Sequence, residues 1–236
     1  KNIFFVDDNL IGKKGHTKEL LSKLIPFKIA YTAQASISLA KDEELMEMLA
    51  RSGCLKVIIG FESLSQSNLK QMRKDSSYQV ENYLADIKKI QSSGIEVEGA
   101  FIFGYDFDDE SVFEKTVEFI NEANLSTAFF NILTPYPGTQ LYQRLKRENR
   151  LFHSDWTKYD GEHACFMPKQ MSQQILEDGH HWVKKQIYSY ESIFKRLYGL
   201  WRLWNENKIR LGDRTSPLFR NLAYAHPFFI RNMESK

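Results

Sequence analysis

Polar side chains recur directly after short apolar runs of the sequence, and their types limit the ligand they could bind. In chain order these groups are Asp7-Asp8-Asn9, Gln34-Ala35-Ser36, Glu62-Ser63, Gly104-Tyr105-Asp106 and Thr134-Pro135-Tyr136-Pro137-Gly138. Four of the five carry a carboxylate or carboxamide, the fifth carries a hydroxyl and a Pro-Gly turn, and none carries Lys or Arg. Such side chains hydrogen-bond well to ammonium groups, ribose hydroxyls and adenine.

The same groups argue against a phosphate ligand. Carboxylates repel phosphate unless a divalent cation lies between them. Neither G-x-G-x-x-G nor G-x-x-x-x-G-K-S/T occurs in the chain, so a dinucleotide is not expected. A cationic nucleoside without phosphate suits these groups better.

The elements that must position these groups alternate between strand and helix. Strand patterns span residues 3–6, 28–34, 57–60, 95–104 and 128–133. Helical patterns lie between them, one of them from an Asp42 cap to Gly53 and another from Ser77 to Gly94. The run 3–6 is continuously apolar, which is typical of a strand covered on both faces. The alternation predicts an α/β fold, a partial (β/α) TIM-like barrel of parallel strands, whose site lies beyond the carboxyl ends of the strands.

Charge is divided unevenly along the chain and predicts two units. Residues 180–236 hold 11 Lys and Arg against 4 Asp and Glu, a balance of +7, whereas residues 1–179 hold 21 against 26, or −5. We expect a partial barrel over residues 1–150 and a C-terminal strap with a helical, basic aromatic extension over 151–236. The first residue is Lys1 and residues 3–6 already read as a core strand, so the chain is expected to be a fragment.

The overall composition excludes several classes of protein. The net charge of +2 does not suit a polycation built for nucleic acid. No run approaches about eighteen apolar residues and no secretion signal is present, so a cytoplasmic location is expected. Two cysteines, Cys54 and Cys165, exclude a disulfide scaffold and a cysteine-based metal knuckle. Each is expected to be a small buried apolar residue.

Four segments in this order and spacing resemble the radical S-adenosylmethionine enzymes. They are 6–9 (VDDN), 59–63 (IGFES), 99–104 (GAFIFG) and 134–139 (TPYPGT). The resemblance is closest to the branch that often carries an N-terminal cobalamin-binding domain, the anaerobic Mg-protoporphyrin ester cyclase-like group. Residues 155–161 and the helix after Met171 also resemble the C-terminal extension of one such subgroup.

The resemblance implies that the strand ends bind S-adenosylmethionine. Residues 7–9 would contact its amino group, Glu62 with Ser63 its ribose or methionine moiety, and strand 99–104 and residues 134–135 its adenine. The cofactor-binding residues expected are Asp7, Asp8, Asn9, Gln34, Ser36, Glu62, Ser63, Phe103, Gly104, Thr134 and Pro135. No catalytic residue and no metal ligand is assigned.

The cysteines depart from the family pattern. The family holds a 4Fe–4S cluster with a C-x3-C-x2-C motif, and neither Cys54 nor Cys165 belongs to one. The cluster ligands are therefore expected upstream of this chain, which alone should not perform radical chemistry. The parent would cleave S-adenosylmethionine reductively to a 5′-deoxyadenosyl radical or transfer methyl through cobalamin. The partners expected are an unidentified small-molecule substrate and an upstream domain of the same protein.

Two other functions stay open on the residues alone. The first is a metal-dependent barrel lyase or hydrolase using Asp7, Asp8 and Glu62 around Mg²⁺ or Zn²⁺, although few histidines lie near these positions. The second is a non-catalytic partner-binding module that uses the basic aromatic tail.

The C-terminal tail admits two interpretations. From Ile193 its spacing fits an amphipathic helix with Lys195, Arg196 and Arg202 on other faces. Packing against the domain is favoured over a partner surface or an anionic membrane interface. The adjacent pair His180-His181 is expected to be solvated, because neighbours on a helix point in different directions.

Overall fold

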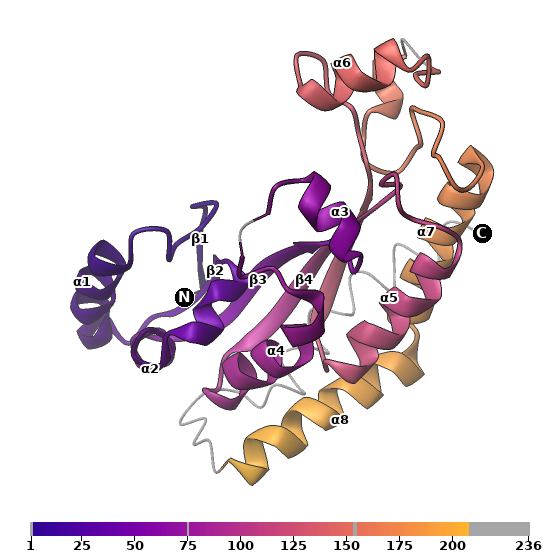
Figure 1. The fold of residues 1–236 in the computed structure, drawn as a ribbon. Helices are drawn as coiled ribbons and strands as arrows, with labels where there is room; N and C mark the ends of the chain where they lie inside the picture. The colour runs from indigo at the N-terminus through magenta and orange to yellow at the C-terminus, as the bar shows by residue number, and fades with distance from the viewer. Residues whose placement is uncertain (1, 75, 153–154, 208–236) are drawn as a thin grey trace.

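Five parallel strands form one sheet in the part of the chain that the structure, a computed structural model, describes: residues 2–74, 76–152 and 155–207. The strands are β1 (Asn2–Phe5), β2 (Ala30–Gln34), β3 (Cys54–Glu62), β4 (Glu96–Phe103) and β5 (Thr127–Ile132). Each strand pairs with the next in chain order, and the sheet curls into half of a barrel (Figure 1). This confirms the partial α/β barrel that the alternating pattern predicts.

Helices connect the strands and extend the chain beyond the last one. They are α1 (Lys14–Leu24), α2 (Glu43–Ser52), α3 (Gln66–Gln71), α4 (Tyr83–Ser92), α5 (Ser111–Glu122), α6 (Gln140–Arg147), α7 (Gln173–Ile187) and α8 (Tyr190–Glu206). The predicted Asp42 cap is confirmed, since its carboxylate accepts the Leu45 amide at 3.0 Å. Gly53 ends α2 with φ of 101°, a left-handed conformation that favours glycine.

One predicted helix begins later than its pattern indicates. The sequence predicts a start at Ser77, but α4 begins at Tyr83 after a 3₁₀ turn, η3 (Val80–Asn82). The Gln66 side chain is the physical reason: its amide nitrogen donates to the Tyr78 carbonyl and its oxygen accepts the Val80 amide, both at 3.1 Å. The first of these bonds occupies the Tyr78 carbonyl, an acceptor that a helix through this stretch would need.

The two faces of the sheet differ in burial. One face packs against the helices, and its aromatic rings Phe61, Phe101, Phe103 and Phe130 stack with centroids 5.6–6.0 Å apart. On the other face Phe4 is 49% exposed and Phe129 is 41% exposed. The expectation that strand 3–6 is covered on both faces is therefore wrong for the described residues, because half a barrel leaves its concave face open.

Three charged residues lie inside strands that the sequence suggests are apolar. Lys56 Nζ lies 2.6 Å from Glu98 Oε1 and 3.9 Å from Glu96 Oε2, and Thr127 also bonds Glu98. All three charged side chains are buried, which pairing of opposite charges makes tolerable. They lie toward the amino ends of β3 and β4, away from the strand ends that carry the candidate site.

The C-terminal helices cover the outside of the half-barrel. Helix α7 packs on α5 and β5, and α8 packs on α4 and α5 (Figure 1). Trp204 is buried and its indole donates to the Gln91 carbonyl at 2.7 Å, whereas Phe194 and Trp201 stay about half exposed. Packing of this tail is therefore confirmed for one face of α8 only. Within the described residues, no helix has the length and apolar character needed to cross a membrane.

Arg196 corrects the predicted polar face of α8. Its side chain is buried, and the guanidinium donates to the backbone carbonyls of Leu125 at 2.8 Å and Ile187 at 2.9 Å. Burial lowers the pKa of Arg196 to about 10. The charged side chain therefore fastens the helix to the barrel instead of facing water.

Candidate functional site

The parallel order brings the carboxyl ends of all five strands to one edge of the half-barrel. Backbone hydrogen bonds continue past the strand ends: Leu10 N donates to Gln34 O at 2.9 Å, and Ala35 N to Ile58 O at 3.0 Å. Leu133 N bonds Phe103 O in the same way. The loops that carry the predicted site residues are thereby held beside one another, as the fold class requires.

Glu62 lies at an irregular position at the end of β3. Its φ is 66°, which is uncommon for a residue with a side chain, and the pairing of β3 with β4 shifts register between Gly60 and Glu62. A Cβ at Gly60 would lie 2.6 Å from Glu62 Oε1. Strain of this kind is typical of positions where a side chain has a function.

Lys74 is the cation partner of the Glu62 carboxylate. Lys74 Nζ lies 3.2 Å from Glu62 Oε1 and 4.6 Å from the centre of the Tyr78 ring. Both members of the ion pair are partly exposed. The carboxylate therefore accepts an ammonium group in this position, which sequence reasoning did not assign because Lys74 follows α3 rather than a strand.

Residues 7–9 lie exposed after β1, and one of them contacts the next strand end. Asn9 Oδ1 accepts the Ser36 amide at 3.3 Å, and Ser36 Oγ lies 2.6 Å from Ser38 Oγ. Asp7 and Asp8 are exposed and Gln34 is half-buried. The structure thus brings the first two strand ends together and leaves the carboxylates of Asp7 and Asp8 open to a ligand.

Ser63 points away from the solvent-facing side of the loop. It is buried, and its Oγ accepts the Asn68 side-chain amide at 3.1 Å and the Ser65 backbone amide at 3.0 Å. Asn68 in turn donates to Asp108 Oδ1 at 2.6 Å. The Ser63 hydroxyl therefore connects α3 to the loop after β4, a positioning contact.

Phe103 and Gly104 lie at the end of β4, where Gly104 makes backbone contacts and Phe103 packs through its ring. Gly104 has φ of 101°, and the amides of Gly104 and Tyr105 both donate to Asp108 Oδ2 at 3.0 Å. The Phe103 ring packs among the buried rings of the helix-facing side. Burial raises the pKa of Asp108 to about 6, against the opposing effect of the hydrogen bonds it accepts from Tyr105, Gly104 and Asn68.

Asp106 is held by cations from later in the chain. Arg150 Nη1 lies 2.9 Å and Lys169 Nζ 3.2 Å from its oxygens, and Arg144 and Gln71 also donate to it. Burial alone raises the pKa of Asp106, but the hydrogen bonds from Arg144, Gln71 and Arg150 outweigh it and hold the pKa well below its usual range. This strand-end carboxylate therefore anchors α6 and residues 167–170.

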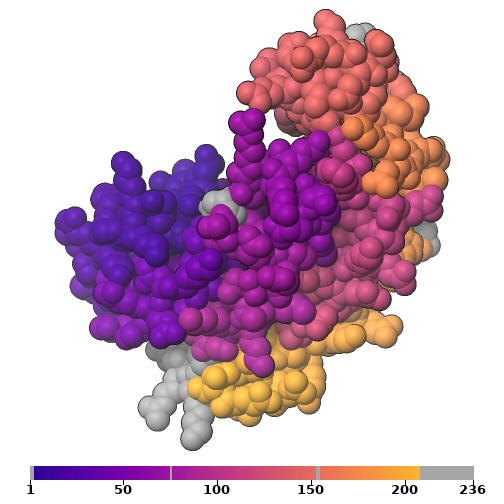
Figure 2. All heavy atoms as spheres, viewed as in Figure 1, coloured from indigo at the N-terminus to yellow at the C-terminus, as the bar shows by residue number. Residues whose placement is uncertain are grey.

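The fifth strand end leads into α6. Thr134 is half-buried with its hydroxyl donating to the Ile132 carbonyl at 3.0 Å, and Pro135 is buried. The segment around α6 projects from the rest of the molecule as a lobe (Figure 2). Thr139 caps the start of α6, since its Oγ1 accepts the Tyr142 amide.

A metal site built from Asp7, Asp8 and Glu62 does not form among the described residues. The group of His, Cys, Asp and Glu ligand atoms that does come within 4.8 Å of one another is Glu162, His180 and His181. The two cysteines are buried, Cys54 at the start of β3 and Cys165 beyond α6. Burial raises the pKa of Cys165 to about 11, as expected for an inert buried thiol.

Comparison with known proteins gives three findings. Residues 139–231 match a family described as a domain of unknown function (DUF4070). The chain is 34% identical over 195 residues to bacteriochlorophyllide d C-12(1)-methyltransferase of Chlorobaculum tepidum, covering 83% of this chain and 42% of that protein. It is 25% identical over 191 residues to anaerobic magnesium-protoporphyrin IX monomethyl ester cyclase of Cereibacter sphaeroides, covering 77% of this chain and 31% of that protein.

The fold has a matching solved structure. Radical S-adenosylmethionine methyltransferase TsrM from Kitasatospora setae, solved with cobalamin and a 4Fe–4S cluster bound, aligns with a TM-score of 0.55 at 17% identity. The alignment covers 62% of this chain and 28% of that one. The chain spans less than half the length of each of these proteins. The chain is thus similar in sequence to these methyltransferases and the ester cyclase and in fold to a radical S-adenosylmethionine methyltransferase, in agreement with the resemblance of its strand-end motifs.

Proposed function

We propose that this chain is the C-terminal portion of a radical S-adenosylmethionine enzyme and supplies the strand-end rim that binds S-adenosylmethionine. The observation that carries the proposal is Glu62, a carboxylate on a strained backbone that already accepts the ammonium group of Lys74. The relatives named above are methyltransferases and a cyclase. The parent is accordingly a methyltransferase or cyclase that acts on a small molecule.

The residues present fit S-adenosylmethionine. Asp7, Asp8 and Glu62 offer carboxylates with solvent access, and these suit an α-ammonium or ribose hydroxyls. Ile58, Ala100 and Ile102 are half-buried along the open face of the sheet and offer apolar contact to adenine. When bound, S-adenosylmethionine supplies a methyl group or, on reduction, an organic radical. The chain's own residues orient it: Glu62 holds a positive group in place, and Asn9 and Ser36 position the loop beside it.

The residues present do not fit a 4Fe–4S cluster. Such clusters need several thiolates close together, whereas Cys54 and Cys165 are both buried and lie on separate elements. We place the cluster ligands in a segment that precedes this chain, which suits the greater length of the relatives. Cobalamin, bound by TsrM, would be held by an upstream domain of the same protein.

The organisation and surroundings of the chain are part of the same proposal. Residues 1–150 would form the partial barrel and residues 151–236 the strap and helical extension. The DUF4070 match, which begins at residue 139 and continues through α7 and α8, supports a distinct C-terminal unit. The location would be the cytoplasm. The small-molecule substrate would meet the open face of the half-barrel beside the strand ends.

Two experiments on the full-length protein test the proposal. The first reads the fifty or so residues that precede Lys1, where we expect C-x3-C-x2-C; its absence would refute the radical enzyme. The second reconstitutes the protein anaerobically and measures iron, cobalamin and S-adenosylmethionine cleavage together. We expect iron to be bound and S-adenosylmethionine to be cleaved or to donate methyl.

A substitution links that activity to this chain. Glu62→Gln should weaken S-adenosylmethionine binding about tenfold with iron content unchanged, because a charge-assisted hydrogen bond becomes a neutral one. Glu81→Gln, an exposed carboxylate in η3, is the matched control and should bind as the wild type does. Equal binding by the Glu62 and Glu81 variants, measured by equilibrium dialysis, would remove Glu62 from the site.

A further inference from the structure

Three metal-ligating side chains meet beside α7 and β5, away from Glu62 and the residues after β1. Glu162, His180 and His181 have ligand atoms that all lie within 4.8 Å of one another. Both histidines are on α7, and Glu162 belongs to the segment 155–166, which we call the strap. The proposed function uses none of these residues.

His180 has a lone pair with no hydrogen-bond donor facing it. The side chain is fully buried with its ring against Phe103, which corrects the expectation of a solvated pair for His180, whereas His181 is exposed as expected. Its Nε2 lies 3.1 Å from the carbonyl oxygen of Phe130 in β5. Because a carbonyl can only accept, Nε2 carries the proton and Nδ1 carries the lone pair. Among the described residues, Nδ1 has no hydrogen-bond partner.

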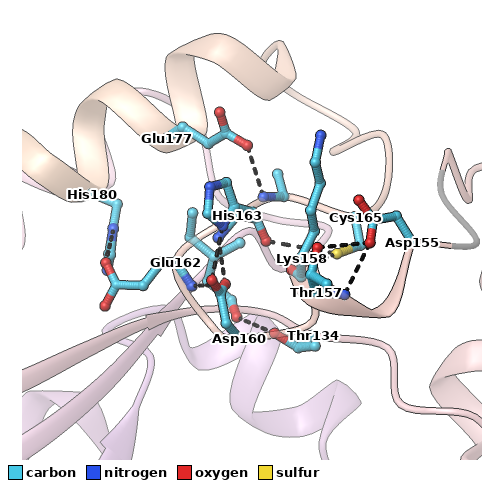
Figure 3. A network of polar contacts seen from close by, with 12 residues as sticks. Thr134, Asp155, Thr157, Lys158, Asp160, Glu162, His163, Cys165, Glu177 and His180 are labelled. Carbon is cyan, nitrogen blue, oxygen red and sulfur yellow. Dashed lines mark hydrogen bonds and ion pairs between the residues drawn. The ribbon is translucent and has the colours of Figure 1, made fainter.

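The Glu162 carboxylate faces this lone pair. Glu162 Oε2 lies 3.8 Å from His180 Nδ1, and the two groups point toward each other (Figure 3). The separation is too long for a hydrogen bond. Two acceptors that face each other repel unless a cation lies between them.

The strap is shaped to present Glu162. Asp160 Oδ1 accepts the amides of Glu162 at 2.8 Å and His163 at 3.1 Å, which forms a tight turn. Gly161, with φ of 81°, accepts the Ile132 amide at 2.6 Å and so pairs the strap with the edge of β5. Glu162 is thus fixed on both sides, by the turn and by the strand.

His181 and Lys184 complete the surroundings. His181 is exposed, and its ring centre lies 5.6 Å from that of His180, so its side chain can turn toward the cluster. Lys184 Nζ lies 2.5 and 2.6 Å from the two oxygens of Glu162. This ammonium holds the carboxylate in place, and a metal ion would displace it from at least one oxygen.

We propose that Glu162, His180 and His181 form a binding site for a divalent transition metal of the zinc class, which fastens the strap to α7 and the edge of β5. Imidazole and carboxylate ligands suit Zn²⁺, whose bonds of about 2.0–2.2 Å separate neighbouring ligand atoms by roughly 3–4 Å. The bond from His180 Nε2–H to a backbone carbonyl is the arrangement that orients metal-binding histidines. A fourth coordination position on the metal ion is left for a water molecule, which would enter from the exposed side where His181 lies.

The test measures Zn²⁺ affinity of the 236-residue chain by competition with a chromophoric chelator. One equivalent should bind, and the melting temperature should rise with added Zn²⁺ because the ion binds only the folded chain. Glu162→Gln and His181→Ala should each weaken binding at least tenfold; neither side chain is buried, so both variants should fold. Lys184→Met should tighten binding several-fold, since the competing ammonium is gone.

His163→Gln is the matched control. His163 is an exposed histidine on the same strap, paired with Asp160 at 2.9 Å, and its loss should leave the Zn²⁺ affinity within twofold of the wild type. The proposal is overturned if the wild type binds no equivalent of Zn²⁺, or if Glu162→Gln and His181→Ala bind as the wild type does. This outcome is independent of the proposed function, because S-adenosylmethionine binding is not measured.

Discussion

At the scale of single residues, the position of the Glu62 carboxylate depends on the space around it as well as on its charged partner. Gly60 leaves the room into which the Glu62 carboxylate folds, and the positive φ of Glu62 turns that carboxylate out of the regular strand. Lys74 then fixes its position. A glycine at position 60 and a strained backbone at Glu62 thus place a carboxylate where a cationic ligand can reach it.

Gly60→Ala should therefore weaken S-adenosylmethionine binding in the full-length protein. The new Cβ would lie 2.6 Å from Glu62 Oε1, so the carboxylate must move away from Lys74, and we expect about a tenfold loss, or about 1.4 kcal/mol. Equilibrium dialysis measures the affinity. Gly15→Ala, where the added Cβ meets nothing within 4 Å, should leave it unchanged; an unaltered affinity in both variants would contradict this role for Gly60.

At the scale of elements, buried charged groups attach the C-terminal segments to the barrel. Asp106 binds Arg144 near the end of α6 and Arg150 after it. Arg196 of α8 donates to the backbone carbonyl after α5 and to that of the last residue of α7. These contacts join a C-terminal segment to a loop of the barrel, or in the case of Ile187 join α8 to the end of α7. The helices are therefore oriented by hydrogen bonds as well as by apolar packing.

Arg196→Met should lower the free energy of unfolding by about 2–4 kcal/mol. Methionine fills a similar volume but leaves the buried carbonyls of Leu125 and Ile187 without the guanidinium donors. Urea unfolding followed by tryptophan fluorescence provides the measurement. Arg202→Met on the same helix removes an exposed residue that pairs with Glu206 at 3.4 Å, and its effect should stay within about 0.5 kcal/mol; similar losses in both variants would contradict the anchoring role of Arg196.

At the scale of the whole molecule, two neighbouring carboxylates should give the stability opposite dependences on pH. The folded-state pKa of Asp108, about 6, lies above the ordinary value of 3.8. Its contribution to stability is therefore complete below about pH 4 and is lost as the pH rises through 6. The pKa of Asp106 is lowered, so its contribution is present above about pH 4 and is lost as the pH falls through the folded-state value.

Asp108→Asn should reduce the change in the free energy of unfolding of the chain between pH 4 and 6. The wild type should lose on the order of 2 kcal/mol more than the variant over this interval, because only the wild type must ionise a buried carboxyl. The free energy of unfolding in urea at a series of pH values tests this.

Asp106→Asn serves as the comparison variant, because Asp106 should change the stability with pH in the opposite direction. It should cost stability at pH 7 and progressively less as the pH falls below 4, where the unfolded wild-type chain takes up a proton at Asp106 while the folded chain still resists it. A wild-type slope retained in Asp108→Asn would show that Asp108 does not titrate in this range.

The sequence by itself determined the parallel half-barrel and the edge on which polar groups gather. Periodicity and caps such as Asp42 act within a few residues, and parallel strands bring their carboxyl ends together whatever the loops do. The direction and partners of those groups were decided only by tertiary structure. Asp106 meets cations 38 and 44 positions away, Lys74 folds back on Glu62, and α7 buries His180 against β5. Such pairings depend on how distant segments pack, which no local pattern encodes.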